Sequence, residues 1–230
     1  MTMNEIKKYE RGYDKGEKIT PDKIRLTGID LFPEKYETLL SVDEFTKERF
    51  EELFDVKTGQ WCVEDGWVIG KNPDMCPGMI VSKDDFFGDV MFEITAATIP
   101  PSTHDINIMI HGEWDDEKGR GNAYVTGLEA FWHGYIGFEK SPKYDLTAAT
   151  ALFDFEPGRE YKFSIMNLGN RIFVFVDDKM CFDIKDPSPI DADKYGKIGV
   201  EAFSSHLKFK NLRVYRPVYE KVREYYCPEF

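Results

Sequence analysis

Regular alternation of apolar and polar residues over Asp105–Glu113 constrains the fold of this chain more than any other feature. Successive side chains of a β-strand point to opposite faces, so isoleucines at every second position would share one face. Isoleucine stands at 106, 108 and 110, and around these positions stand Asp105, Asn107, Met109, His111 and Glu113. An amide, an imidazole and two carboxylates in one row suit a ligand that carries many hydroxyl groups. We therefore predict a half-buried strand whose polar face meets such a ligand.

Strand-like segments separated by turn residues continue from Gln60 onward. Typical turns are Glu64–Gly66, Asn72–Asp74 and Leu168–Asn170, and no segment after Phe54 keeps a helical period for three turns. The pattern predicts an all-β fold, namely a two-sheet antiparallel jelly-roll sandwich with one short N-terminal helix.

The expected organisation has three parts. Residues 1–55 form a charged lead-in that packs on the body, and within it Ser41–Glu44 reads as a capping box that opens a short helix through Phe54. Residues 56–216 form the jelly-roll domain. Residues 217–230 form an aromatic tail, which we expect to dock on its own domain, with a second subunit of a homo-oligomer as the alternative.

The net charge and the cysteines indicate which binding partners and which cellular compartment to expect. The net charge of −12 argues against nucleic acid and anionic membrane surfaces, because both attract clustered lysine and arginine. The four cysteines are widely spread and form neither a CxxC pair nor a zinc-like cluster with histidine. The N-terminus shows no apolar run, so we expect a cytoplasmic protein with reduced thiols and no membrane segment.

Five segments resemble strands of the concanavalin A-like lectin/glucanase superfamily. Trp61–Ile69 is similar to the first strand pair of such jelly rolls, and Gly78–Lys83 with Phe87–Glu93 is similar to the following pair. Gly196–Ala202 and Leu207–Tyr215 are similar to the strands that close the fold. The resemblance covers roughly residues 55 to 216 and implies a sandwich whose concave sheet meets a carbohydrate.

Gly127–Tyr135 narrows this resemblance to two bacterial groups. It resembles the YesU-like family, a galectin-like fold of unknown activity, and more loosely the 3-keto-disaccharide hydrolase family, in which a Glu-containing strand occupies this place. Glucanases of the superfamily carry Glu-x-Asp-x-x-Glu on one strand, which places nucleophile and general acid on one face. Here Glu129 is followed by Phe131, His133 and Gly134 where further carboxylates would stand, so a standard retaining glucanase is not expected.

The candidate catalytic residues come from the same stretch, since we expect Ala123–Phe138 to be one strand. Its odd positions would line a groove beside the polar row described above, with Glu129, Phe131, His133 and Tyr135. A carboxylate, an imidazole and a phenol can bind sugar hydroxyls or transfer protons. The alternative is a solvated sheet face with a few cross-strand hydrogen bonds.

Roles follow from side-chain chemistry. In an enzyme, the residues that transfer protons would be Glu129 with the assistance of His133 or His111. The residues that orient the sugar by hydrogen bonds would be Asn107, Glu113 and Tyr135, and Trp114 would stack on the sugar ring.

No residue set establishes a metal or cofactor. His111 and His133 could coordinate a metal ion together with Glu113 or Glu129. The polar loop after Trp114 offers oxygen ligands for Ca²⁺, although its spacing is not that of an EF-hand, from Asp115, Asp116, Glu117 and Asn122.

The leading hypothesis is a cytoplasmic carbohydrate-processing protein that binds a mono- or oligosaccharide in the concave sheet. As an enzyme it would be a glycoside hydrolase or lyase that acts on keto-sugars, because a ketone acidifies the neighbouring C–H bond. The first alternative is a non-catalytic, lectin-like sugar-binding module, which the lack of a paired-carboxylate motif favours. The second alternative is a structural subunit whose sheet face or aromatic tail forms an oligomer interface.

Overall fold

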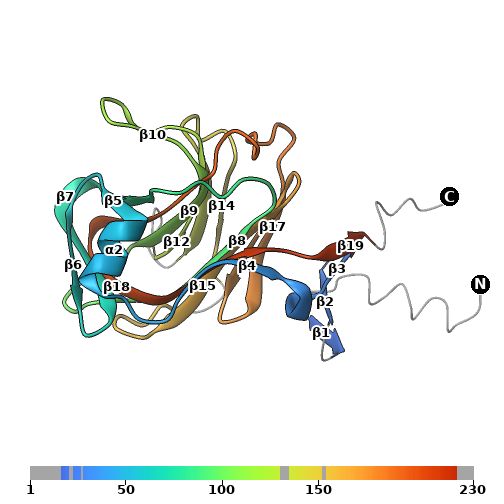
Figure 1. The fold of residues 1–230 in the computed structure, drawn as a ribbon, viewed down its shortest axis with the longest axis horizontal. Helices are drawn as coiled ribbons and strands as arrows, with labels where there is room; N and C mark the ends of the chain where they lie inside the picture. The colour runs from blue at the N-terminus through green and yellow to red at the C-terminus, as the bar shows by residue number, and fades with distance from the viewer. Residues whose placement is uncertain (1–16, 21–22, 27, 130–134, 152–153, 222–230) are drawn as a thin grey trace, which may run out of the picture.

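The predicted all-β architecture is confirmed by the computed structural model, in which antiparallel strands form a two-sheet sandwich (Figure 1). The structure describes residues 17–20, 23–26, 28–129, 135–151 and 154–221. Within these ranges, no helix is long and apolar enough to cross a membrane.

The first sheet contains short antiparallel strands together with parts of two longer strands. In spatial order it contains β14 (Thr147–Thr150), β13 (Ile136–Ser141), β12 (Ala123–Leu128), β9 (Ile106–Gly112), the first part of β18 (Lys197–Arg216), the second part of β7 (Trp67–Ser82) and β5 (Phe54–Val56).

The second sheet begins at the other part of β18 and runs outward on both sides. One side contains β8 (Met91–Thr98), β15 (Tyr161–Leu168), β16 (Arg171–Val176) and β17 (Lys179–Lys185). The other side contains the first part of β7, its neighbour β6 (Gln60–Glu64) and, further along, β4 (Glu37–Val42).

Two long strands therefore belong to both sheets. In β18 the register with β7 shifts between Phe203 and Ser205, and Ser204 between them has a φ of 52°. A residue in the left-handed region bends a strand, and such a bend with an extra residue carries the chain from one sheet to the next.

The core lies between the sheets and is filled by every second residue of their strands. Ile106, Ile108 and Ile110 point into it from the first sheet, as the alternation predicts. Phe163 and Phe209 are among the fully buried residues that meet them from the second sheet.

A small sheet of four strands packs on the outer face of the second sheet. It contains β1 (Glu17–Thr20), β2 (Lys23–Leu26), β3 (Ile29–Leu31) and, from the other end of the chain, β19 (Tyr219–Lys221). Leu26, Ile29 and Leu31 bury against Phe173 and Met166, with Tyr219 at the side. Figure 1 shows this sheet at one end of the molecule, opposite the helix α2.

The expected short helix is present, but it begins later than the capping box indicated. The helix α2 covers Lys47–Leu53, and its N-cap is Thr46, whose hydroxyl accepts a hydrogen bond of 3.2 Å from the backbone N–H of Arg49. Ser41 is still part of β4, where it pairs with β18. Strand pairing therefore takes the residues that the local pattern assigned to a helix start. A 3-10 turn, η1 (Pro33–Lys35), precedes β4.

Candidate carbohydrate-binding site

A polar cluster lies on the outer face of the first sheet, the face that points away from the core. Asn107 on β9 and Glu201 on β18 are direct cross-strand partners, and the residues on either side of each in the chain belong to the core. Glu139 on β13 and Asp105, just before β9, lie on the same side. The fifth member, Arg120, comes from β11 (Gly119–Arg120). We call these five residues the Arg120 cluster.

Hydrogen bonds and ion pairs connect all five side chains. The Arg120 guanidinium donates through Nη2 to Glu139 Oε1 at 3.0 Å and through Nη1 to Glu201 Oε2. The Asn107 amide donates to Asp105 Oδ1 at 2.7 Å and to Glu201 Oε1 at 3.3 Å. The side chains of Arg120, Glu139 and Glu201 are only 9%, 8% and 3% exposed.

The pKa values of two carboxyl groups in the Arg120 cluster are raised above their ordinary values. Burial, with the nearby Glu201 carboxylate, raises the pKa of Asp105 from its ordinary 3.8 to about 8. Burial also raises the pKa of Glu139 to about 7, although Arg120 opposes that shift. One guanidinium cannot neutralise three carboxylates, so the cluster holds a carboxylic acid at neutral pH. Groups of this kind are suited to proton transfer.

Two buried atoms of the Arg120 cluster have no hydrogen-bond partner among the residues that the structure describes. They are Asn107 Oδ1, an acceptor, and Arg120 Nε, a donor. An unsatisfied buried polar atom costs roughly 1–3 kcal/mol, so native structures keep few of them. A hydroxyl group both donates and accepts, so a ligand rich in hydroxyls has the matching chemistry.

Two glycines lie beside Asn107 on neighbouring strands. Gly127 on β12 is in register with Asn107 on one side and with Gly137 of β13 on the other. Glu139 follows on the same face of β13. Neither glycine adds a side chain of its own to this part of the face.

The strand ends next to the Arg120 cluster have strained backbones. Asp105 has a φ of 75° and Glu129 a φ of 48°, values that side-chain-bearing residues rarely adopt. Leu128 and Ile106 form the last pair of β12 with β9, and Glu129 and Asp105 are their respective neighbours in the chain. The Ser205 hydroxyl donates to the Asp105 carbonyl oxygen at 2.8 Å and holds this turn.

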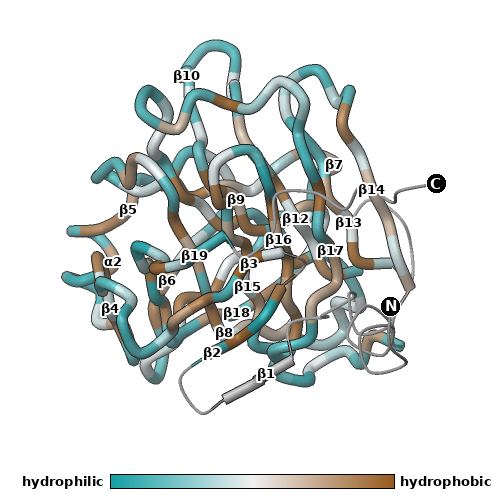
Figure 2. The backbone as a smooth tube through the Cα atoms, turned by 90° about the vertical axis from the view of Figure 1, so that its right-hand side faces the viewer, coloured by the Kyte–Doolittle hydropathy of each residue, from teal (hydrophilic) through white to brown (hydrophobic). Residues whose placement is uncertain are grey.

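A hairpin of β10 (Trp114–Asp115) and β11 connects β9 to β12 and crosses part of the outer face. Trp114 packs on an apolar patch of five sheet residues: Met79, Val81, Met109, Ala123 and Val125. Asp116, between the two strands of the hairpin, pairs with Lys57, which follows β5, at 3.2 Å. Figure 2 shows that the tip of this hairpin is hydrophilic. Trp114 thereby covers this apolar patch, and the hairpin carries Arg120 to Glu201, the cross-strand partner of Asn107.

The prediction that His111 shares the face of the polar row is wrong. Met109 pairs with Gly199 but Gly112 pairs with Lys197, so β9 has one extra residue against β18 at this point. Such a bulge interrupts the alternation, and His111 takes a φ of 50°. Its side chain consequently turns into the interior of the sandwich.

His111 is well packed there. It is 1% exposed, its Nδ1 lies 3.1 Å from the carbonyl oxygen of Tyr195, and its ring meets that of Tyr124 edge-on at 6.2 Å. Burial lowers the pKa of His111, so the imidazole is neutral. The structure thus separates His111 from Asn107 and from the Arg120 cluster.

The expected single strand over Ala123–Phe138 is also wrong, because β12 and β13 form an antiparallel pair in which Leu128 faces Ile136. Glu129 follows the end of β12 and is half-buried, and Tyr135 precedes β13 with 44% of its surface exposed. His133 lies outside the described residues.

The remaining predicted residues lie in the hairpin. Glu113 is exposed and accepts a hydrogen bond of 3.0 Å from the side chain of Asn122. Asp115 accepts two backbone hydrogen bonds within its own turn, and Asp116 pairs with Lys57. Across the described ranges, no group of three or more His, Cys, Asp or Glu side chains is arranged to hold a metal ion.

The sequence model of the 3-keto-alpha-glucoside-1,2-lyase-like domain matches residues 43–215. The chain belongs to this family. The match confirms the looser of the two predicted family resemblances, and it spans both sheets of the sandwich, including every member of the Arg120 cluster. No curated protein sequence matches the chain.

Several solved structures are similar to this chain. The carbohydrate-binding module CBM66 from Bacillus subtilis has a TM-score of 0.57 and 16% identity over 70% of this chain and 94% of that one. A galectin-like protein of unknown function from Bacillus subtilis has a TM-score of 0.64 and 13% identity, covering 80% and 99%. The endo-beta-1,3-glucanase from Pyrococcus furiosus has a TM-score of 0.62 and 14% identity, covering 86% and 99%. At this level of identity the likenesses show the fold, a jelly roll of the galectin and glucanase type.

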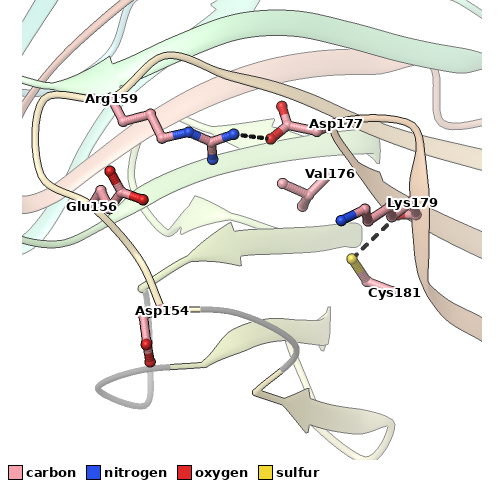
Figure 3. Close-up of a pocket in the computed structure, with 7 residues that line it drawn as sticks. All are labelled: Asp154, Glu156, Arg159, Val176, Asp177, Lys179 and Cys181. Carbon is pink, nitrogen blue, oxygen red and sulfur yellow. Dashed lines mark hydrogen bonds and ion pairs between the residues drawn. The ribbon is translucent and has the colours of Figure 1, made fainter.

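The structure has a separate pocket of about 260 Å³ beside the β16–β17 turn. Its lining is drawn in Figure 3 and consists of Asp154, Glu156, Arg159, Val176, Asp177, Lys179 and Cys181. Arg159 is already paired with Asp177 at 2.6 Å. Burial raises the pKa of Cys181 to about 11, so its thiol is not a nucleophile at neutral pH. None of the predicted site residues lies here.

Sequence reasoning missed three members of the site in this lyase-like domain. Glu201 stands between Val200 and Ala202, and Glu139 follows Phe138 in its strand. A carboxylate next to apolar strand residues is the signal that could have found them. Arg120 stands in a polar loop that reads as a calcium loop, so nothing local marked it as a partner of distant carboxylates.

Proposed function

We propose that this chain cleaves a 3-keto-glycoside by elimination, with the sugar bound at the Arg120 cluster. The observation that carries the proposal is the pair of unpartnered buried atoms, Asn107 Oδ1 and Arg120 Nε, within a cluster that also holds a neutral carboxylic acid. Membership of the lyase-like family supplies the sugar class.

The two residues with unpartnered atoms, Asn107 and Arg120, would bind the sugar and polarise its ketone. A ketone oxygen only accepts hydrogen bonds, so Arg120 Nε–H is the suitable donor for the carbonyl at C3. Asn107 Oδ1 accepts from a neighbouring hydroxyl of the sugar. The positive charge of Arg120 would stabilise the enolate that forms next to the ketone, and it acts in a site shielded from water.

Glu129 is the proposed base that removes the proton from C2. Its carboxylate has no hydrogen bond or ion pair with any described residue, whereas Glu139 and Glu201 are both held by Arg120. It is only half-buried, and it follows Leu128, whose partner Ile106 is the chain neighbour of Asp105. A carboxylate that is accessible and unpaired can reach a C–H bond that the ketone has acidified.

The test is turnover of nitrophenyl 3-keto-glucosides followed by mass spectrometry of the sugar product. Elimination gives an unsaturated ketone, whereas hydrolysis gives a keto-sugar that is heavier by one water. The Arg120→Gln variant should lose turnover, while Arg159→Gln, which removes an exposed ion pair on the second sheet, should retain it. A wild-type protein that releases no nitrophenol above the spontaneous rate would refute the proposal.

A non-catalytic sugar-binding module is the second candidate. The observation in its favour is that Glu139 and Glu201 are both committed to Arg120, which leaves no free pair of carboxylates within the Arg120 cluster. Stabilisation of the protein by a 3-keto-glucoside without any turnover would support this candidate, and loss of that stabilisation in Arg120→Gln would place the ligand.

A further inference from the structure

We propose that Asp105 is the catalytic acid of this site, which gives its proton to the glycosidic oxygen as the C1–O bond breaks. The inference rests on the proposed elimination and adds to it the residue that serves the leaving group. It distinguishes Asp105 from the two other carboxylates of the Arg120 cluster, which bind Arg120.

Asp105 is buried and its carboxyl group is held at one oxygen. Asp105 is 4% exposed, its Oδ1 accepts the Asn107 amide at 2.7 Å, and its carbonyl oxygen accepts from Ser205 at 2.8 Å. Among the described residues, no hydrogen bond reaches its second carboxyl oxygen, Oδ2. The carboxyl group is thus held in one orientation, and the oxygen that can carry the proton remains available to a ligand. Its left-handed φ of 75° is the kind of strain that clusters at functional sites.

The surroundings of Asp105 carry more negative than positive charge. Arg120 lies between Glu139 and Glu201 and pairs with both, so two carboxylates share its single positive charge. Glu201 also shares the Asn107 amide with Asp105. A further negative charge on Asp105 would be buried beside these carboxylates and Arg120 would offset it only in part, so the neutral, protonated form is favoured. The pKa of about 8 that burial and Glu201 produce agrees with this geometry.

The proposed step balances in atoms and electrons. Glu129 takes the proton from C2, the electrons of that C–H bond form the C1–C2 double bond through the enolate, and the C1–O bond breaks. Asp105 gives its proton to the departing oxygen and becomes a carboxylate, while Glu129 becomes an acid. Transfer of one proton from Glu129 back to Asp105, directly or through water, restores both, and no oxidant or reductant is needed.

The assignment predicts a dependence on the leaving group. A nitrophenolate leaves without protonation, but an alkoxide does not, so Asp105→Asn should slow methyl 3-keto-glucoside by about 10²- to 10⁴-fold and spare the nitrophenyl glycoside. Asp30→Asn is the matched control, because Asp30 is also buried but pairs with Arg25 in the small N-terminal sheet. Its turnover of both substrates should equal that of the wild type.

A second measurement needs no variant and therefore does not depend on how Asp105→Asn folds. In the wild type, kcat/KM for the methyl glycoside should fall above about pH 8, where Asp105 loses its proton, and that for the nitrophenyl glycoside should not. Equal alkaline limbs for both substrates, or equal slowing of both by Asp105→Asn, would overturn the assignment of Asp105 and leave the elimination standing. Absence of turnover with either substrate would overturn both proposals.

Discussion

Replacement of Asp105 by asparagine should change how stability depends on pH, whatever the protein does to a sugar. The pKa of Asp105 is about 8 in the folded chain and ordinarily 3.8, so the folded state holds a proton that the unfolded state releases. The contribution of this group is complete below its unfolded pKa and is lost as pH rises through the folded pKa. Stability of the wild type should therefore decrease from pH 5 to pH 8.

The size of this change follows from the proton balance. Each unit of pH across the interval between the two pKa values changes the free energy of unfolding by about 1.4 kcal/mol, which gives about 4 kcal/mol between pH 5 and pH 8. Glu139, whose pKa is raised to about 7, adds a further loss of stability as pH rises from 5 to about 7. The difference between wild type and Asp105→Asn isolates the part that belongs to Asp105.

The assay is urea unfolding of both proteins in steps from pH 5 to pH 8. Asparagine keeps the acceptor for Asn107 and carries no charge, so Asp105→Asn should gain stability relative to the wild type as pH rises. Asp30→Asn is the control, and its difference from the wild type should stay constant from pH 5 to pH 8. Arg25 holds the pKa of Asp30 below its ordinary value, so the contribution of Asp30 is lost only in stronger acid. Parallel pH curves for the wild type and Asp105→Asn would refute the reasoning about the buried acid.

Three further outcomes are expected. Arg120→Met should lower the free energy of unfolding in urea by about 3–5 kcal/mol, since it leaves two buried carboxylates unpaired, whereas the exposed pair lost in Arg159→Met should cost about 1 kcal/mol or less. Glu129→Gln should slow release from nitrophenyl 3-keto-glucoside by about 10²- to 10⁴-fold with an unchanged melting temperature, and full turnover would exclude it as the base. Cys181 should resist alkylation at pH 8 in the folded protein and react readily in urea, and mass spectrometry of the labelled peptide measures both rates.

The alternation of apolar and polar residues in the sequence was sufficient to predict the orientation of most side chains in β9. The three isoleucines of β9 point into the core and Asn107 points out, as a period of two requires. The same rule failed at His111, because a single extra residue in β9 reverses the alternation and no local residue type announces such a bulge.

The rest of the site depends on contacts that a local pattern does not contain. Glu201 lies 94 positions from Asn107 and Arg120 lies 81 positions from Glu201, so only the pairing of β18 with β9 brings them together. Glu129 was expected inside a long strand, yet the chain reverses there and β13 returns beside β12. In this chain, strand pairing rather than composition decides which carboxylates meet a cation.

The hairpin of β10 and β11 has a consequence for how such domains diversify. It joins β9 to β12, two antiparallel neighbours that a turn of two residues could connect. The four other members of the Arg120 cluster stand on or beside the sheet, and Arg120 is supplied by this insertion. Exchange of the hairpin for one of another length or sequence would replace the cation and the cover over the apolar patch without breaking a strand pair. The sheet can thus stay the same while a hairpin of another sequence places other side chains over it.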